Sequence, residues 1–382
     1  MKKIPFNKPE ANSFSDHHLI ELKKNNHFSS GGKFTKLCEK WLKLNLKCKE
    51  ALLVHSCTAA LEMTALLLDI KHGDEIIMPS YTFVSTANAF VLRGGKPVFI
   101  DIDSTTCNID VTKIEKAINK KTKAIVVVHY AGVSCDMDPV LKIAKKYNIF
   151  VIEDAAQAIM STYKGRPVGS IGDLATLSFH QTKNIHCGEG GALIINNKKF
   201  INKARIIRDK GTNRDLFNKN MIKKYTWVYY GSSYGLSEIN AVFLYSQLIQ
   251  VRKIIKKRLQ IFNYYLKLFS KIDRKNIIKI PKVPNYSKPN GHMFYIIIQK
   301  NKRAKLMNYL KKKKISSVFH YIPLHSSIFG KIKTKTKFSM SNTNKISKNL
   351  LRLPLHTYMS VNDVLKIFKE IDFFFNRLNS KN

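Results

Sequence analysis

The chain has 382 residues, of which 44% are hydrophobic and 10% aromatic, and it carries a formal net charge of +40 at pH 7. This length and composition predict a folded protein of two or three domains and exclude a disordered one. The longest apolar runs, such as 124–128 and 149–152, have the length of strands, so we expect no membrane span.

Two further features predict a cytoplasmic protein. No apolar stretch follows the basic residues near the N-terminus, so this segment does not resemble a signal peptide. The six cysteines form no CxxC pair and show no metal-ligand spacing, which is typical of reduced thiols in the cytosol. We therefore expect neither a disulfide framework nor a metal site.

The large positive charge raises the possibility of a nucleic-acid-binding protein. The lysines are scattered, however, and they accompany many asparagines and isoleucines, whereas a binding groove more often clusters arginine with aromatic residues. The pattern favours a compositional drift of the solvated faces, and we expect no nucleic acid as a partner. The electrostatic field of this positive charge can still attract a phosphorylated substrate by raising the rate of encounter.

Strand-sized and helix-sized patterns alternate through the first two-thirds of the chain. The expected strands are 75–78, 97–101, 124–129, 150–153, 174–179 and 192–196. The expected helices between them are 58–69, 85–93, 111–118 and 139–146. This alternation predicts βαβ units, and therefore an α/β fold with a mostly parallel sheet that is covered by helices on both faces.

The last third of the chain has a different pattern. One long helix is expected from Ser237 towards Phe269, followed by a strand at 293–298 and helices near 303–313 and 361–375. We therefore expect a large domain of residues 1–250 and a small α+β domain of residues 251–382. The stretch 330–344 is poor in apolar residues, and we expect it to be a mobile loop.

The strongest chemical signal is a lysine that follows a buried strand. Lys183 lies in the stretch 177–184, and a glycine-rich stretch follows at 188–191. A lysine that attacks a carbonyl must be rigidly aimed and partly desolvated, and a turn after a buried strand provides both conditions. Because lysine is so common in this chain, only this context distinguishes Lys183 from the others.

An acidic residue lies at the end of another expected strand. Asp154 follows the apolar residues Val151 and Ile152, at the edge where open α/β sheets bind ligands. A carboxylate at this position can keep a pyridine nitrogen protonated, which makes the ring an electron sink. The alternative is that Asp154 only caps the next helix.

Two turns offer further binding groups. Cys57 and Thr58 open a helical pattern, and the free N–H groups of a helix start suit a phosphate. Phe83 lies in the turn 79–86, where its ring can stack on a planar ligand. The alternatives are an ordinary helix cap for the first turn and ordinary packing for the second.

These segments, occurring together and in this order, resemble the DegT/DnrJ/EryC1/StrS family of sugar aminotransferases, which have the aspartate aminotransferase-like (type I) fold of pyridoxal-phosphate enzymes. The similarity extends along nearly the whole chain, through 31–35, 74–83, 128–132, 153–157, 178–184 and 321–325. The stretches 78–94, 129–138, 210–214 and 318–325 are most similar to the members that make dTDP-4-amino-4,6-dideoxygalactose for the enterobacterial common antigen.

The resemblance implies roles for individual residues. Lys183 would be the catalytic residue, holding pyridoxal 5'-phosphate covalently and moving protons between cofactor and substrate. Asp154 would pair with the pyridine nitrogen, and Gln157 would bond the phenolic oxygen of the ring. Phe83 would stack on the ring. The cofactor phosphate would be held by Cys57, Thr58 and Ser178.

The resemblance also implies a homodimer with shared active sites. Family members receive a polar side chain from the partner subunit, often an asparagine in a stretch before the long helix. This chain instead reads Gly-Ser-Ser-Tyr-Gly at 231–235, and Ser233 would take that role with a shorter reach.

The expected reaction has two stages. L-glutamate would give its amino group to the cofactor, and C4 of dTDP-4-dehydro-6-deoxy-D-glucose would then receive it, giving dTDP-4-amino-4,6-dideoxy-D-galactose. The alternatives are another nucleotide-sugar 3- or 4-aminotransferase of the same family and a related dehydratase, in which histidine replaces the lysine. A basic nucleic-acid-binding protein on a retired enzyme fold is the alternative from another class. The intact Lys183 and the complete set of cofactor positions disfavour the last two.

Overall fold

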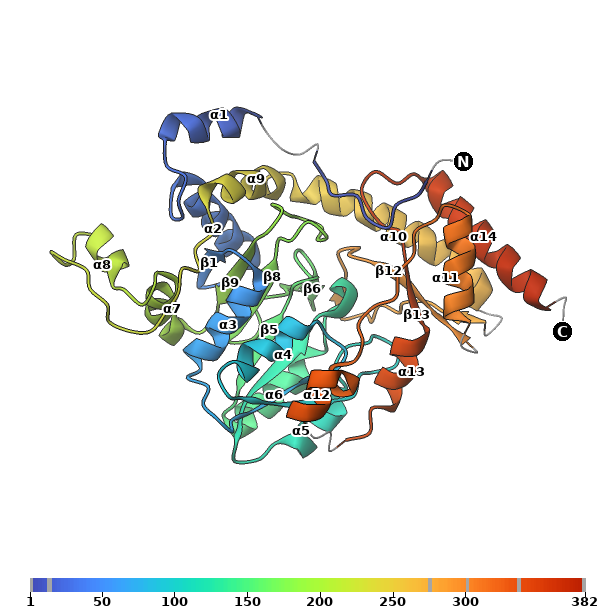
Figure 1. The fold of residues 1–382 in the computed structure, drawn as a ribbon, viewed down its shortest axis with the longest axis horizontal. Coiled ribbons are helices and arrows are strands. Elements are labelled where there is room, and N and C mark those ends of the chain that lie inside the picture. The colour runs from blue at the N-terminus through green and yellow to red at the C-terminus, as the bar shows by residue number, and fades with distance from the viewer. Residues whose placement is uncertain (1–2, 12–15, 274–276, 300–301, 335–337, 380–382) are drawn as a thin grey trace.

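The computed structural model describes residues 3–11, 16–273, 277–299, 302–334 and 338–379, and its largest element is a seven-stranded sheet (Figure 1). The strand order is β1-β9-β8-β5-β4-β2-β3. The strands are β1 (Glu50–Val54), β2 (Glu75–Pro79), β3 (Lys96–Ile100), β4 (Thr122–Val128), β5 (Phe150–Asp154), β8 (Leu174–Ser178) and β9 (Gly191–Ile195). Neighbouring strands are parallel except at β9, which is antiparallel to both β8 and β1. The predicted α/β fold with a mostly parallel sheet is confirmed.

Helices bury both faces of this sheet. In β4, Ala124 and Val126 belong to one apolar core while Ile125 and Val127 belong to another, because successive side chains of a strand point to opposite faces. One face is covered by α3 (Cys57–Leu67), α4 (Val84–Val91) and α7 (Ile201–Arg208). The other face is covered by α2 (Lys33–Leu46), α5 (Ile114–Ala117), α6 (Met137–Tyr147) and α9 (Glu238–Leu248).

A second, smaller sheet lies in the C-terminal part of the chain. Its antiparallel order is β10-β12-β13, formed by β10 (Ile278–Lys279), β12 (Phe294–Ile298) and β13 (Leu350–Leu353). Three helices build an apolar core with it, namely α10 (Val251–Asp273), α11 (Arg303–Lys312) and α14 (Val361–Asn379). Our domain boundary between residues 250 and 251 stays a prediction.

The single long helix expected from Ser237 is wrong. The structure has two helices, α9 and α10, separated by a turn at Ile249 and Gln250. The apolar pattern crosses this turn without interruption, because Leu248 and Val251 are both buried in the same core. Periodicity therefore did not reveal the break.

The mobile loop expected at 330–344 is also wrong at both of its ends, and residues 335–337 lie outside the described residues. The helix α12 (Ile328–Lys333) begins at Ser327, whose Oγ accepts a hydrogen bond from Gly330 N. The helix α13 (Ser341–Asn349) begins where buried Asp101 accepts hydrogen bonds from the backbone N–H groups of Asn342 and Thr343. Both caps are polar, and the one at α13 is also long-range, so an apolar pattern does not predict them.

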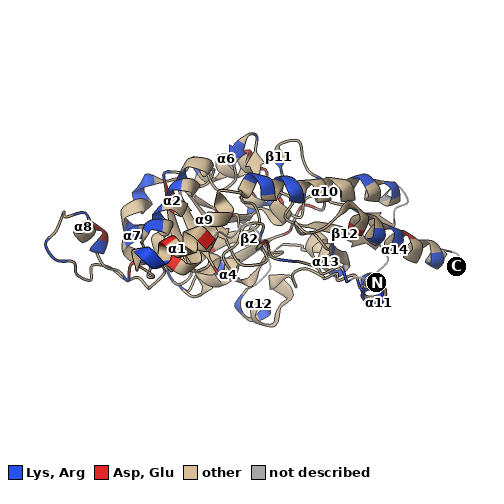
Figure 2. Cartoon of the chain, turned by 90° about the horizontal axis from the view of Figure 1, so that it is seen from above, with Lys and Arg blue, Asp and Glu red and all other residues tan. Residues whose placement is uncertain are grey.

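The remaining α-helices and strands are short. They are the helices α1 (Asp16–Asn25) and α8 (Arg214–Asn218) and the strands β6 (Thr162–Tyr163), β7 (Arg166–Pro167) and β11 (Ser287–Lys288). The strands form a small sheet that connects the two parts of the chain. Among the described residues, no helix is long and apolar enough to cross a membrane. Figure 2 shows lysine and arginine on α2, α7, α10 and α14, towards opposite ends of the molecule.

Candidate active site

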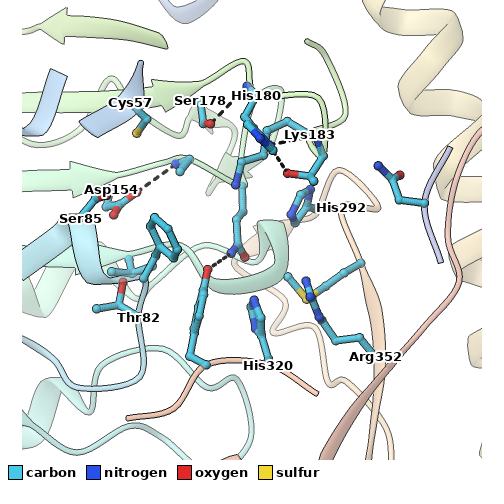
Figure 3. A pocket seen from close by; sticks show the side chains of 18 of the residues that line it. Cys57, Thr82, Ser85, Asp154, Ser178, His180, Lys183, His292, His320 and Arg352 are labelled. Atoms are coloured by element: carbon cyan, nitrogen blue, oxygen red, sulfur yellow. Dashed lines mark hydrogen bonds between the residues drawn. The ribbon is translucent and has the colours of Figure 1, made fainter. Parts of the chain in front are cut away.

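A cavity of about 880 Å³ lies at the carboxyl ends of β5 and β8, where parallel sheets commonly bind ligands. Residues of the C-terminal part, including His320 and Arg352, form its other wall, and Phe6 and Asn7 of the N-terminal segment also line it. Figure 3 shows Cys57, Ser178 and Asp154 on one side of this cavity and His292 and Arg352 on the other. The cavity therefore gathers residues from distant parts of the chain.

Lys183 lines this cavity from the connection between β8 and β9. Backbone hydrogen bonds fix the turn: Lys183 N donates to His180 O at 2.9 Å, and Gln181 N donates to Gly188 O at 2.8 Å. Gly188 has a φ of +84°, which glycine adopts without strain. Burial lowers the pKa of the Lys183 amine, and the positive charge of Arg352 lowers it further, while Cys57 and Asp154 act in the opposite direction. The turn thus aims a partly desolvated amine into the cavity.

Asp154 is the last residue of β5 and is buried. Its Oδ2 accepts a hydrogen bond from Thr86 Oγ1 at 2.7 Å, and its Oδ1 accepts one from Ala156 N at 3.2 Å. The alternative that Asp154 caps the next helix is wrong, because the described residues from 155 to 161 form turns and no helix. The carboxylate is therefore fixed at the cavity wall without serving a helix.

The start of α3 provides a group of donors beside these residues. Ser56 caps the helix, since its Oγ accepts a hydrogen bond from Ala59 N, and Cys57 and Thr58 follow at the cavity wall. A Cβ on Gly191 would lie 2.4 Å from the carbonyl carbon of Ser56, so this close approach of β9 requires glycine. Burial raises the pKa of the Cys57 thiol to about 12, which keeps it uncharged. The uncharged thiol and the helix N-terminus suit an anion.

The other predicted residues of the same chain also reach the cavity. Ser178 ends β8 and lines the wall next to α3. Gln157 accepts a hydrogen bond from Ala131 N through Oε1 and donates one from Nε2 to the Tyr321 hydroxyl at 2.8 Å. Phe83 lines the cavity with 54% of its surface exposed, which leaves its ring available to a planar ligand. The fold thus brings seven of the eight predicted residues to one cavity.

The eighth, Ser233, is exposed and is not among the residues that line the cavity. It pairs with Asp209 in an isolated β-bridge. Its predicted role requires a partner subunit, so that role stays a prediction.

Sequence reasoning missed several residues of the opposite wall. His320 is stacked on Tyr321 with ring centres 3.6 Å apart, and its Nδ1 is hydrogen-bonded to the Tyr130 hydroxyl at 2.6 Å. Burial holds the pKa of His320 well below its usual value, so the ring is neutral at pH 7. His292, Arg258 and Arg352 also line this wall. The similarity of 318–325 was a signal for His320 and Tyr321, whereas no local pattern marks the other three.

The donors of this cavity fit pyridoxal phosphate. A desolvated lysine suits its aldehyde, and a buried carboxylate suits its ring nitrogen. A helix N-terminus with neighbouring hydroxyl and thiol groups suits its phosphate. Among the described residues, no group of His, Cys, Asp and Glu could hold a metal ion.

Comparisons with known proteins agree with this fit. Residues 9–372 match the model of the DegT/DnrJ/EryC1/StrS aminotransferase family. The spore coat polysaccharide biosynthesis protein SpsC of Bacillus subtilis is 32% identical over 381 residues, covering 96% of this chain and 97% of that protein. The structure of Helicobacter pylori PseC, an aminotransferase of pseudoaminic acid biosynthesis, superposes with a TM-score of 0.90 at 26% identity, covering 98% of this chain and all of that one. The PLP form of Spr1654 from Streptococcus pneumoniae gives a TM-score of 0.86 at 26% identity, covering 96% and 97%.

The fold, the cavity and these similarities define a pyridoxal-phosphate-dependent aminotransferase that acts on sugars. The chain belongs to the DegT/DnrJ/EryC1/StrS aminotransferase family. The predicted type I fold, the cofactor and the enzyme class are thereby confirmed.

Proposed function

We propose that this enzyme transfers the amino group of L-glutamate to C4 of dTDP-4-dehydro-6-deoxy-D-glucose, giving dTDP-4-amino-4,6-dideoxy-D-galactose for a cell-surface polysaccharide. The observation that carries the catalytic part is the convergence of Lys183, Asp154 and the start of α3 on one cavity. The choice of sugar rests on the similarity of 78–94, 129–138, 210–214 and 318–325 to enzymes of that reaction. The role of SpsC in spore coat polysaccharide biosynthesis supports a role in making a cell-surface polysaccharide.

Pyridoxal phosphate, when bound, supplies an aldehyde carbon that exchanges amino groups and a ring that takes up electrons. Lys183 Nζ would hold the cofactor, and the amine, once released by L-glutamate, would accept the α-proton of L-glutamate and deliver a proton to the sugar carbon in the second stage. Its lowered pKa makes it a better base near neutral pH than an exposed lysine. Asp154 would keep the ring nitrogen protonated, and Gln157 would orient the ring through the N–H that is not bonded to Tyr321.

Thr58, Ser178 and Cys57 would hold the phosphate of the cofactor together with the N-terminal N–H groups of α3. Phe83, which is exposed at the cavity, would pack on the cofactor ring. A cavity of about 880 Å³ accommodates a sugar next to the cofactor, since ligand pockets of this size bind molecules larger than an amino acid. The active unit is a homodimer in which Ser233 reaches the site of the partner subunit.

The test is a two-stage assay on the purified enzyme loaded with pyridoxal phosphate. L-glutamate alone should bleach the visible band of the bound cofactor and release one equivalent of 2-oxoglutarate per site. A panel of dTDP- and UDP-linked 3-keto and 4-keto sugars should then identify the acceptor, with the position and the axial or equatorial orientation of the new amine read by NMR. Amination of a 3-keto sugar only, or of a UDP sugar only, would replace the proposed substrate with that one.

A further inference from the structure

His292 is a buried residue of the cavity wall that faces the start of α3, and Figure 3 shows it between Lys183 and Arg352. Its Nδ1 is hydrogen-bonded to Asn184 Oδ1 at 2.9 Å. Its Nε2, by contrast, is accessible and has no hydrogen-bond partner among the described residues. This nitrogen is therefore available to a ligand in the cavity.

The hydrogen bonds of Asn184 decide which nitrogen of His292 carries the proton. Asn184 Nδ2 donates to the carbonyl oxygen of Asn290 at 3.0 Å, so the atom of this amide that faces His292 must be the oxygen. An amide oxygen only accepts, and His292 Nδ1 is therefore the donor in their contact. Burial, together with the positive charges of Lys183 and Arg258, holds the pKa of His292 well below its usual value, so the ring is neutral at pH 7. The proton lies on Nδ1, and Nε2 presents a lone pair to the cavity.

The backbone around His292 is fixed by hydrogen bonds. Arg258 is buried, and its guanidinium donates to the carbonyl oxygens of Gly291 at 3.1 Å and His292 at 2.7 Å. Gly291 has a φ of +63°, and a Cβ at this position would lie 3.0 Å from the backbone carbonyl carbon of Arg258, so this contact with α10 favours glycine. On the other side, Asn290 Nδ2 donates to the carbonyl oxygen of Gln157 at 2.9 Å. The lone pair of His292 Nε2 is thus aimed before any substrate binds.

A fixed acceptor selects a ligand that can donate a proton. Carboxylates and ketones only accept hydrogen bonds at pH 7, so 2-oxoglutarate has nothing to donate, and L-glutamate adds only the amino group that is transferred. The proposed keto sugar has hydroxyl groups at C2 and C3 of its ring, and a hydroxyl donates readily. His292 lies close to Lys183, whose charge lowers its pKa, and so it lies at the reacting end of the cavity. The acceptor therefore suits the sugar ring and offers nothing to the carboxylates of the amino donor.

The charged acceptors of the cavity are already engaged. Among the described residues, the carboxylates that line it are Asp154, which accepts from Thr86, and Glu189, which is paired with His180. A further carboxylate near the sugar would repel the diphosphate of the sugar nucleotide, whereas a neutral imidazole accepts a hydroxyl without this repulsion.

We propose that His292 is a specificity-determining residue of the second stage, in which its Nε2 accepts a hydrogen bond from a ring hydroxyl of the keto sugar. This inference rests on the proposed function, since the amino donor offers no hydroxyl. Asn184 is the positioning residue that sets the tautomer of His292.

The test combines one change in His292 with one change in the substrate. In His292→Asn the amide nitrogen takes the place of Nδ1, so the bond to Asn184 is kept while the acceptor Nε2 is lost. The substrates are the keto sugar nucleotide and its 2-deoxy and 3-deoxy forms. We expect His292→Asn to lower kcat/KM of the second stage by about 2- to 12-fold with the complete sugar, the range for one hydrogen bond between neutral groups. With the deoxy sugar that lacks the bonded hydroxyl, parent and variant should have equal kcat/KM, because the pair is already broken.

The amino-donor stage is the internal control. His292→Asn should release 2-oxoglutarate from L-glutamate at the rate of the parent, because this stage uses no hydroxyl. His292→Gln, whose longer side chain can present an oxygen near the position of Nε2, should recover part of the loss in the second stage. His72→Asn changes an exposed histidine that does not line the cavity, and it should match the parent in both stages.

The tautomer is measured without turnover. In 15N NMR of histidine-labelled enzyme, the signals that disappear in His292→Asn belong to His292. We expect a protonated Nδ1 and an unprotonated Nε2 at pH 7, and a proton on Nε2 would overturn the proposal.

The kinetic outcomes separate the remaining roles. Equal losses in both stages would assign His292 to the Lys183 amine, and equal losses with the complete sugar and both deoxy forms would make His292 structural; either result, or an unchanged second stage, overturns the proposal. If the parent aminates a different sugar of the panel, the proposed substrate is wrong, and the same comparison with that sugar and its deoxy forms decides the role of His292.

Discussion

Thr86 Oγ1 donates a hydrogen bond to Asp154 Oδ2 at 2.7 Å, and so the first turn of α4 fixes the carboxylate at the end of β5. Thr82 Oγ1 lies 2.8 Å from the same Thr86 oxygen. Because Thr86 gives its only proton to the carboxylate, Thr82 must be the donor in this second contact. A chain of two hydroxyl groups thus orients the carboxylate before any ligand binds.

Asp154→Asn tests this carboxylate. The substitution keeps the size and an acceptor for Thr86 but removes the charge that holds a proton on the cofactor ring. We expect the rate of amino transfer to fall by at least roughly a hundredfold, which is the range for loss of a positioned acid–base partner. Thr86→Val should cause a smaller loss in the same direction, and Asp138→Asn, which alters an exposed carboxylate, should cause none. Single-turnover kinetics with L-glutamate measure all three, and a nearly normal rate in Asp154→Asn would give it a structural role only.

Lys183→Ala should abolish both the covalent attachment of the cofactor and turnover, while free pyridoxal phosphate can still bind at the start of α3. The expected result is loss of the visible band of the lysine-bound cofactor, checked by absorbance and by mass spectrometry after borohydride reduction. Lys164→Ala is the matched control, since Lys164 is exposed and pairs with Asp138. Normal turnover in Lys183→Ala would refute the mechanism.

The pH dependence of cofactor capture reports on the same amine. Burial lowers the pKa of Lys183 below the ordinary 10.5, because it disfavours the charged form. Capture of pyridoxal phosphate by cofactor-free protein should therefore rise with pH, with a midpoint below pH 10.5. Arg352→Gln should move the midpoint upward, since the charge of Arg352 contributes to the lowering. Stopped-flow absorbance measures both profiles, and a parent midpoint near 10.5 would contradict this environment.

The net charge of +40 predicts a measurable but non-specific attraction to DNA. If this charge reflects compositional drift, binding should be weak at low salt and vanish near physiological salt, because it depends on counterion release. Fluorescence anisotropy with several unrelated duplexes at increasing salt tests this. Tight binding to one sequence at physiological salt would support the nucleic-acid-binding alternative.

The proposed sharing of active sites in a homodimer predicts complementation between two inactive variants. Ser233→Glu should block the partner's site by placing a charge next to the cofactor phosphate, whereas Lys183→Ala inactivates its own site. A mixed dimer places both defects in one site and leaves the other intact. Mixtures of the two variants should therefore recover activity, up to about half per mixed dimer, that neither has alone. A fully active monomer, shown by light scattering at assay concentration, would exclude a shared site.

The sequence by itself determined the elements whose signals are local. The bounds of strands β2, β4, β5 and β8 were predicted to within a few residues, because strands buried on both faces are short apolar runs in the sequence. Asp154 and Cys57 were found for a similar reason, since they lie at the end of such a strand and at the start of a helix, and Lys183 was found in the turn that follows β8. Ser178 was predicted only from the family resemblance. The order of strands along the sheet then brings these ends together.

Only the tertiary structure decided which residues form the opposite wall of the cavity. Arg352 is one of 66 lysines and arginines, and nothing in its neighbouring residues separates it from the rest. Arg352 becomes distinct because β13 pairs with β12 on one side and with Val318 on the other. This pairing directs the Arg352 side chain into the cavity, next to Phe6 from the N-terminal segment. Arg258 shows the same dependence, since only its contacts with Gly291, His292 and Leu355 make it structural. Whether a buried charge finds an acceptor depends on segments far apart in sequence, and a local pattern carries no information about them.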